Sequence, residues 1–204
     1  MRGRGAWEAR DGAIRKGFED LCTQRIHHAN ELRVRLKLLA DKRHCAKQAV
    51  GWLTQRNRGE RASEFAFSSN ADGKAGGHPA LQLSNLAKLG DGALLTIMVI
   101  MEPRTTQVIS FSIGIQGHGR TTRVPWYARV DFTEAPSGQG PCGHPLLHCH
   151  VGQNPEALEE PGIRVPHSWM KPAEVLDWLL ATVEPGLEPQ ATALVRRGSW
   201  RPPG

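Results

Sequence analysis

Two hydrophobic periods divide the chain. Across residues 13–53, apolar or small residues recur at steps of three and four, among them Leu32, Leu36 and Leu39, and this spacing predicts helix. No proline interrupts the segment, and a break near residues 27–30 would divide it into two helices.

From Leu94 onward the period changes to two. Ile109, Phe111 and Ile113 alternate with serine and glycine, the pattern of a half-buried strand. Short turns separate the strands, which favours an antiparallel meander over βαβ units. The predicted strands are Leu94–Met101, Gln107–Ile115, Arg123–Phe132 and His144–Val151.

A last helix is predicted over residues 172–184. Pro172 can take the first helical position, an apolar face follows, and Pro185 ends the segment. We therefore predict an α+β fold, with an N-terminal helical hairpin and a C-terminal helix packed on an antiparallel meander of four to five strands. Along one compact domain, the expected segments are a basic helical segment (1–58), a flexible loop region with one short strand (59–92), the sheet with its helix (93–184) and a disordered tail (185–204).

The composition suits a protein with a core and excludes several classes. Of 204 residues, 39% are hydrophobic, and 22 Gly with 14 Pro fall short of a low-complexity chain. The longest apolar run, 93–101, is too short to span a membrane. The basic start is followed by no apolar stretch, so we expect no secretory signal. Four cysteines do not make a disulfide scaffold, and we expect reduced thiols and a cytoplasmic protein.

The positive charge is concentrated in one segment. The net charge is +6, and residues 24–58 carry nine basic and two acidic residues, a local charge of +7. A localised basic patch attracts polyanions, so this helix is a candidate nucleic-acid surface. The alternative is a core-packing helix whose solvated face is basic. The candidate contacts are Arg33, Arg35, Lys37, Lys42, Arg43 and Lys47.

Residues 142–150 hold three of the nine histidines. On a strand, successive side chains point to opposite faces, so His144, His148 and His150 share one face. Cys149 lies on the other, apolar face and should be buried and inert. The histidines are therefore expected on the polar side of the sheet.

The neighbouring strand could complete this cluster. If residues 123–132 pair antiparallel with it, Arg129 and Asp131 lie on the same polar face. They could then meet His148 and His150 across the ladder.

Such a set can perform acid–base chemistry near neutral pH. His148 and His150 would act as acid and base, Asp131 would orient them, and Arg129 would hold a phosphate. Two histidines and a carboxylate can also bind a metal, and a structural hydrogen-bond network is a further alternative. We predict no cofactor; the zinc set considered and disfavoured is Cys142, His144, His148 and His150.

The C-terminal half resembles uncharacterised prokaryotic domains associated with toxin–antitoxin or phage-defence gene clusters. The matching segments are Tyr127–Phe132, His144–Gly152, Arg164–Pro166 and Pro172–Leu180. This resemblance implies a compact α+β domain with a ribonuclease-like or other nucleic-acid-processing role.

The leading expectation is a small intracellular bacterial protein that acts on nucleic acid, RNA or DNA, as a metal-independent nuclease. An antitoxin or a subunit of a defence complex would be a protein partner, and no membrane is involved. One alternative is a non-catalytic adaptor whose basic helix binds nucleic acid or protein. Another is a sensor that binds a metal or a small ligand on the histidine face.

Overall fold

The chain folds as an antiparallel sheet covered on one face by helices. The computed structural model describes residue 16 and residues 28–105, 107–133, 147–153, 164–166 and 170–187. The helices described are α2 (His28–Asp41), α3 (Ala49–Trp52) and α4 (Pro172–Val183). The strands are β1 (Leu53–Asn57), β2 (Ser63–Phe67), β3 (Gly73–Ala75), β4 (His78–Leu83), β5 (Ala93–Met101), β6 (Val108–His118), β7 (Pro125–Thr133), β8 (Leu147–Gly152) and β9 (Arg164–Pro166).

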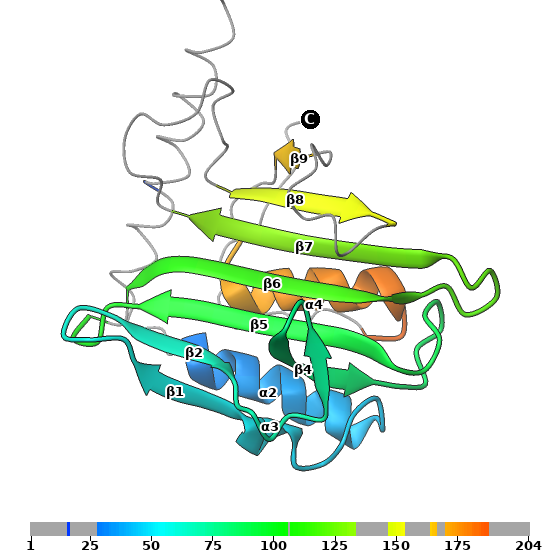
Figure 1. Ribbon diagram of the computed structural model, residues 1–204, viewed down its shortest axis with the longest axis horizontal. Coiled ribbons are helices and arrows are strands. Elements are labelled where there is room, and N and C mark those ends of the chain that lie inside the picture. The colour runs from blue at the N-terminus through cyan, green and yellow to red at the C-terminus, as the bar shows by residue number, and fades with distance from the viewer. Residues whose placement is uncertain are drawn as a thin grey trace, which may run out of the picture.

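The described strands form one nine-stranded sheet with the order β1-β2-β5-β6-β7-β8-β9. Strand β5 pairs with β6 on one edge and shares its other edge between β4 and β2, which pair with its first and second halves. Strand β3 forms a hairpin with β4. Figure 1 shows α2 and α4 together behind the sheet, with the β3–β4 hairpin in front of it. The predicted α+β class is confirmed.

Alternation along the central strands sorts the side chains between the two faces. In β5, Leu95, Ile97 and Val99 are buried, whereas Thr96 and Met98 between them are partly exposed. Strands β6 and β7 continue the same pattern, so the apolar core lies between the sheet and the helices. The other face, called the open face here, carries mainly polar side chains. Both the packing of helices on one face and the polar character of the other agree with the alternation in the sequence.

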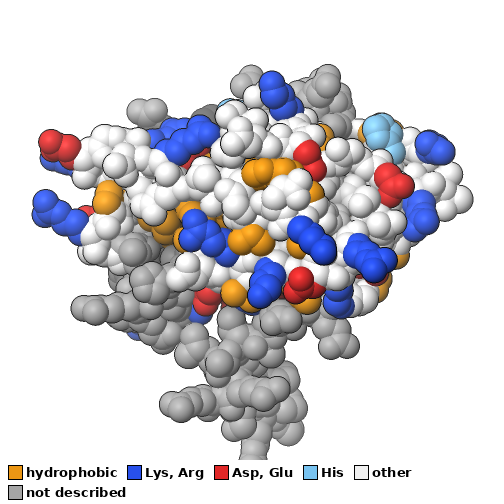
Figure 2. All heavy atoms as spheres, turned by 90° about the horizontal axis from the view of Figure 1, so that it is seen from below, with side chains coloured by type: hydrophobic (Ala, Val, Ile, Leu, Met, Phe, Trp, Pro, Cys, Tyr) orange, Lys and Arg blue, Asp and Glu red, His pale blue; other side chains and the backbone are white. Residues whose placement is uncertain are grey.

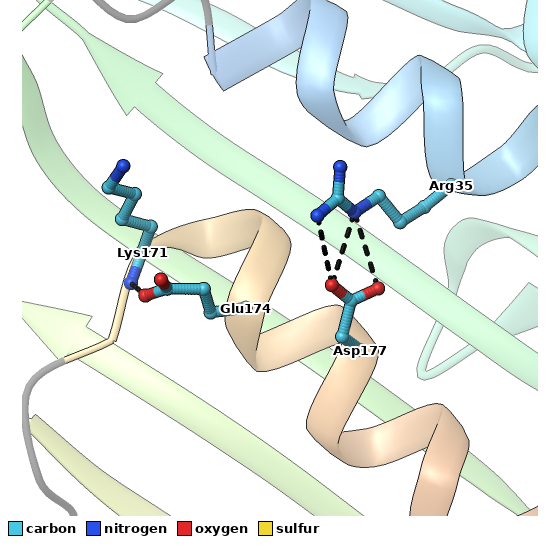
Figure 3. A network of polar contacts seen from close by, with 4 residues as sticks. All are labelled: Arg35, Lys171, Glu174 and Asp177. Atoms are coloured by element: carbon cyan, nitrogen blue, oxygen red, sulfur yellow. Dashed lines mark hydrogen bonds and ion pairs between the residues drawn. The ribbon is translucent and has the colours of Figure 1, made fainter. Parts of the chain in front are cut away.

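A buried ion pair joins the two long helices on the covered face. The Arg35 guanidinium on α2 donates to both carboxylate oxygens of Asp177 on α4, at 3.0–3.2 Å. The two side chains are only 6% and 9% exposed. Figure 3 shows this pair beside the start of α4, where the Glu174 carboxylate accepts a hydrogen bond from the Lys171 backbone N–H at 2.8 Å. That contact satisfies one of the free N–H groups around the helix start.

The N-terminal prediction needs correction. The helical pattern continues through the sequence to residue 53, but α2 ends at Asp41, and only the four-residue α3 follows before β1 begins. Arg43 has a left-handed backbone, with φ of 63°, just after α2, and this conformation ends the helix. The earlier part of the expected hairpin, residues 13–27, lies outside the described residues apart from residue 16, as do residues 188–204 of the expected tail.

The region 59–92, expected to be a flexible loop with one short strand, contains β2, β3 and β4. The sheet therefore has more strands than the four or five predicted. Strand β3 has only three residues, and β1 is exposed along most of its length, so neither carries a clear alternating pattern. Their place in the sheet comes from pairing with distant strands, which local sequence does not reveal.

Candidate functional site: a histidine–carboxylate cluster on the open face

The β7–β8 ladder assembles the predicted cluster. Arg129 lies directly opposite His150, and Asp131 lies opposite His148. All four belong to the open face, because Val130 and Cys149 between them point into the core. The sequence-based prediction that these side chains meet across neighbouring strands is confirmed.

Asp131 is the centre of the cluster. Its Oδ2 atom accepts a hydrogen bond from Arg129 Nε at 2.8 Å and forms an ion pair with Arg129 Nη2, also at 2.8 Å. The same oxygen lies 3.2 Å from Nε2 of His150. One carboxylate oxygen therefore joins a guanidinium and an imidazole, the arrangement in which a carboxylate fixes the orientation of a histidine.

The cluster favours the ionised form of Asp131. Burial acts to raise the pKa of Asp131, but the hydrogen bond with His150 and the charge of Arg129 act against it, and the pKa falls below its ordinary value. Ser112, which lies opposite Asp131 on β6, makes a further side-chain hydrogen bond to the carboxylate, and this contact also lowers the pKa. Asp131 thus keeps a negative charge in a buried polar cluster.

The two histidines are neighbours and are both buried. Their ring centroids are 4.7 Å apart in an edge-to-face arrangement, and His148 and His150 are 6% and 5% exposed. Together with Asp131, they place three possible ligand atoms within 4.8 Å of one another. The set is therefore suited by geometry either to proton transfer or to metal binding.

Arg129 connects the cluster to a pocket on the open face. Its side chain is 24% exposed and lines a pocket of about 440 Å³. Gly114 of β6 lies opposite Arg129, and a Cβ atom there would come within 3.1–3.2 Å of Arg129 Cγ and Cβ. Because Gly114 has no side chain, the Arg129 side chain has room to lie over it.

The basic residues predicted to contact nucleic acid divide into two groups. Arg35 is buried and paired with Asp177, so it is not part of an exposed basic surface. Arg33 lies over the Phe65 ring at 5.0 Å and is partly buried. Helix α2 covers the face of the sheet opposite the histidines, so these residues do not form one surface with the cluster. Exposed among the predicted residues are Lys37, Lys42, Arg43 and Lys47.

Figure 2 shows the side of the molecule that carries α2, α3 and β1. Lysine and arginine side chains are spread across it, with acidic side chains between them. The basic residues of this segment thus share their surface with acidic residues. At least one of them, Arg35, is buried in an ion pair instead.

The predicted cysteine and histidine sites are only partly described. Cys142 and His144, two members of the disfavoured zinc set, lie outside the described residues. Cys149 is buried as predicted, and burial together with the charge of Asp131 raises the pKa of its thiol to about 11. A thiol with so high a pKa is a poor nucleophile near neutral pH.

Sequence analysis did not find the pocket beside the cluster. Its lining includes Arg56 on β1, Arg58 just after β1 and Arg129 on β7, and the first two are far from the third in the chain. Arg56 and Arg58 are two positions apart in the sequence. In an extended chain, this spacing places both side chains on the same face. The sequence before them has a helical pattern, so no strand was predicted at this position.

Comparisons with protein-family models, with curated proteins and with solved structures give no match to this chain. Within the described part of the chain, no helix combines the length and the apolar character needed to cross a membrane.

The lowered pKa of Asp131 predicts a pH-dependent contribution to stability. Such a carboxylate stabilises the fold above its unfolded pKa, about 3.9, and this contribution is lost as pH falls through the lower folded value. Asp131→Asn should therefore lower the melting temperature at pH 7, and the difference from the unmodified protein should shrink below about pH 4. Thermal unfolding at pH 7 and pH 3 measures both. Asp41→Asn, at an exposed position, is the control, and an Asp131→Asn deficit of equal size at both pH values would refute the prediction.

Proposed function

We propose that the protein cleaves phosphodiester bonds in nucleic acid by metal-independent acid–base catalysis, as part of a bacterial defence or toxin–antitoxin system. The observation that carries this proposal is the continuous contact from Arg129 through Asp131 to His150, with His148 beside it. It combines a phosphate-binding group, two proton-transfer groups and an orienting carboxylate in one place. The cellular setting comes from the resemblance of the C-terminal half alone.

The geometry gives each group a role. Because Nε2 of His150 is hydrogen-bonded to Asp131, the neutral ring would carry its free lone pair on Nδ1 and could accept a proton there. His150 would take the proton of the attacking hydroxyl, from water or a ribose, as its oxygen bonds to phosphorus. His148, protonated, would give a proton to the departing oxygen as the other P–O bond breaks. Arg129 would stabilise the charge on the phosphate oxygens.

The contacts of Asp131 favour proton transfer over metal binding. Three donor atoms, two of them from Arg129, already surround Oδ2. A metal ion on this oxygen would displace the His150 contact and lie close to the guanidinium charge, which would repel it.

The experiment that tests this proposal is a cleavage assay with the chelated protein. Labelled single-stranded RNA and DNA of mixed sequence are incubated with protein that has been dialysed against EDTA. We expect cleavage of at least one of the two, and less than stoichiometric zinc by elemental analysis before dialysis. Untreated protein is assayed in parallel. No product from either strand with either preparation would refute the nuclease, and stoichiometric zinc with cleavage by the untreated protein alone would replace the acid–base mechanism by a metal-dependent one.

A second candidate is a non-catalytic adaptor that binds nucleic acid or a partner protein such as an antitoxin. The observation in its favour is the burial of His148 and His150, because buried polar groups commonly serve to fix a fold. In that case the cluster would be structural, and its loss would reduce stability instead of activity.

A further inference from the structure

The pocket beside the cluster runs across the open face of the sheet. Its floor consists of residues from β5, β6 and β7, among them Met98, Gln116 and Arg129. The β3–β4 hairpin contributes Ala75, Gly76, His78 and Pro79 to its wall. Strand β1 contributes Arg56 at the end away from the histidines. Its volume, about 440 Å³, is in the range of binding sites for small ligands or for part of a larger one.

The charges of the lining favour an anion. Three arginines line the pocket: Arg56 has no ion pair among the described residues, Arg58 is paired with Glu64 of the lining, and Arg129 is paired with Asp131 beside it. Arg56 is exposed, and Arg58 has 54% of its side chain exposed, so both can reach a ligand. A guanidinium group is suited to phosphate, because its N–H donors match the phosphate oxygens.

The distance between the arginines sets the size of the ligand. Strand β1 is separated from β7 by β2, β5 and β6. Neighbouring strands lie about 4.8 Å apart, so four spacings separate Arg56 from Arg129 by about 19 Å across the sheet. One phosphate group cannot contact both ends, whereas a chain with several phosphates can.

We propose that this pocket, called the groove from here on, binds a single strand of nucleic acid that lies across the sheet. This inference rests on the proposed function. A phosphate at Arg129 would lie beside the histidine cluster, and phosphates further along the strand would contact Arg58 and Arg56. Bases would lie over the apolar part of the floor, where Met98 is partly exposed. Positive groups along a groove with an apolar surface for bases are the usual combination in proteins that bind single strands. A duplex keeps its bases stacked inside and could not place them in a hollow of this size.

The test is a binding measurement that does not depend on cleavage. Fluorescence anisotropy with labelled RNA and DNA strands of two to ten nucleotides is measured on the His150→Gln protein. Affinity should rise with length until the strand spans the groove, and a mononucleotide should compete poorly. Comparing the RNA strands with the DNA strands shows which sugar is preferred. Binding of either strand, or of both equally, supports the groove as a binding site for single strands.

Two substitutions with opposite expected signs locate the strand. Arg56→Gln removes one phosphate contact, so affinity at 0.1 M salt should fall about fivefold and the salt slope should decrease by about 0.7. Glu64→Gln removes the carboxylate of the lining and should tighten binding. Arg104→Gln, an exposed arginine outside the pocket, should change neither quantity.

Other outcomes separate this inference from the proposed function. If Arg56→Gln behaves like Arg104→Gln, or if polyglutamate competes as well as an oligonucleotide, the groove is not a nucleic-acid site. If the double substitution Lys37→Gln/Lys47→Gln, on α2 and in the segment between α2 and α3, weakens binding and Arg56→Gln does not, the strand binds the helical face. A protein that binds strands through Arg56 and does not cleave them would refute the proposed nuclease activity and support the proposed binding site.

Discussion

Replacing His150 with Gln is expected to lower the cleavage rate by about 10²-fold or more, the loss typical of a removed general acid or base. Glutamine keeps a similar size and can still donate a hydrogen bond to Asp131, but it does not titrate near neutral pH. Cleavage of the labelled strand under single-turnover conditions measures the rate. Thermal unfolding and strand binding should change little, because packing and the phosphate contacts remain.

The same variant tests the structural alternative. If the cluster only fixes the fold, His150→Gln should leave cleavage unchanged and lower stability by about 1–3 kcal/mol, the cost of an unsatisfied buried polar group. His118→Gln, the same substitution at an exposed histidine of β6, controls for the change of residue type. A protein altered in neither cleavage rate nor stability would contradict both hypotheses, since each predicts a change in one of these two quantities.

The geometry of the cluster could be predicted because it depends on local regularities. Alternation along β7 and β8 determines which side chains share a face, and antiparallel pairing of these neighbouring strands brings Asp131 and Arg129 to the histidines. One assumption, that the two strands pair, was enough. The deep burial of His148 and His150 could not be deduced in this way, since alternation indicates a face but not what covers it.

The edge of the sheet and the use of the basic residues could not be predicted. β1 is a mostly exposed strand preceded by a helical pattern, and nothing in its five residues indicates pairing with β2. Arg35 lies off the apolar stripe of α2, so its sequence position suggested a solvated or ligand-binding side chain. Its burial depends on Asp177, which lies 142 residues further along the chain. Such long-range partners determine whether a charge belongs to the surface or to the core.

The Arg35–Asp177 ion pair leads to the largest expected effect on stability. Asp177→Leu should destabilise the protein by about 3–5 kcal/mol, because it leaves a buried guanidinium without this carboxylate. For a chain of this size, that loss corresponds to a decrease in melting temperature of roughly 10 °C. Urea unfolding of the variant and of the unmodified protein gives the free-energy difference. Asp41→Leu, at an exposed position, is the control for introducing leucine.

Replacing both partners should restore most of this loss. Burial, together with the charge of Glu174, raises the pKa of Asp177 although the hydrogen bond and charge of Arg35 lower it, so burying this carboxylate carries a desolvation cost. An apolar pair avoids that desolvation, so Arg35→Met/Asp177→Leu should be close to the unmodified protein in stability, or above it. Arg35→Met alone should be strongly destabilised, since it leaves a buried carboxylate. If the double variant is as unstable as either single variant, the ion pair makes a net contribution that apolar packing between α2 and α4 cannot replace.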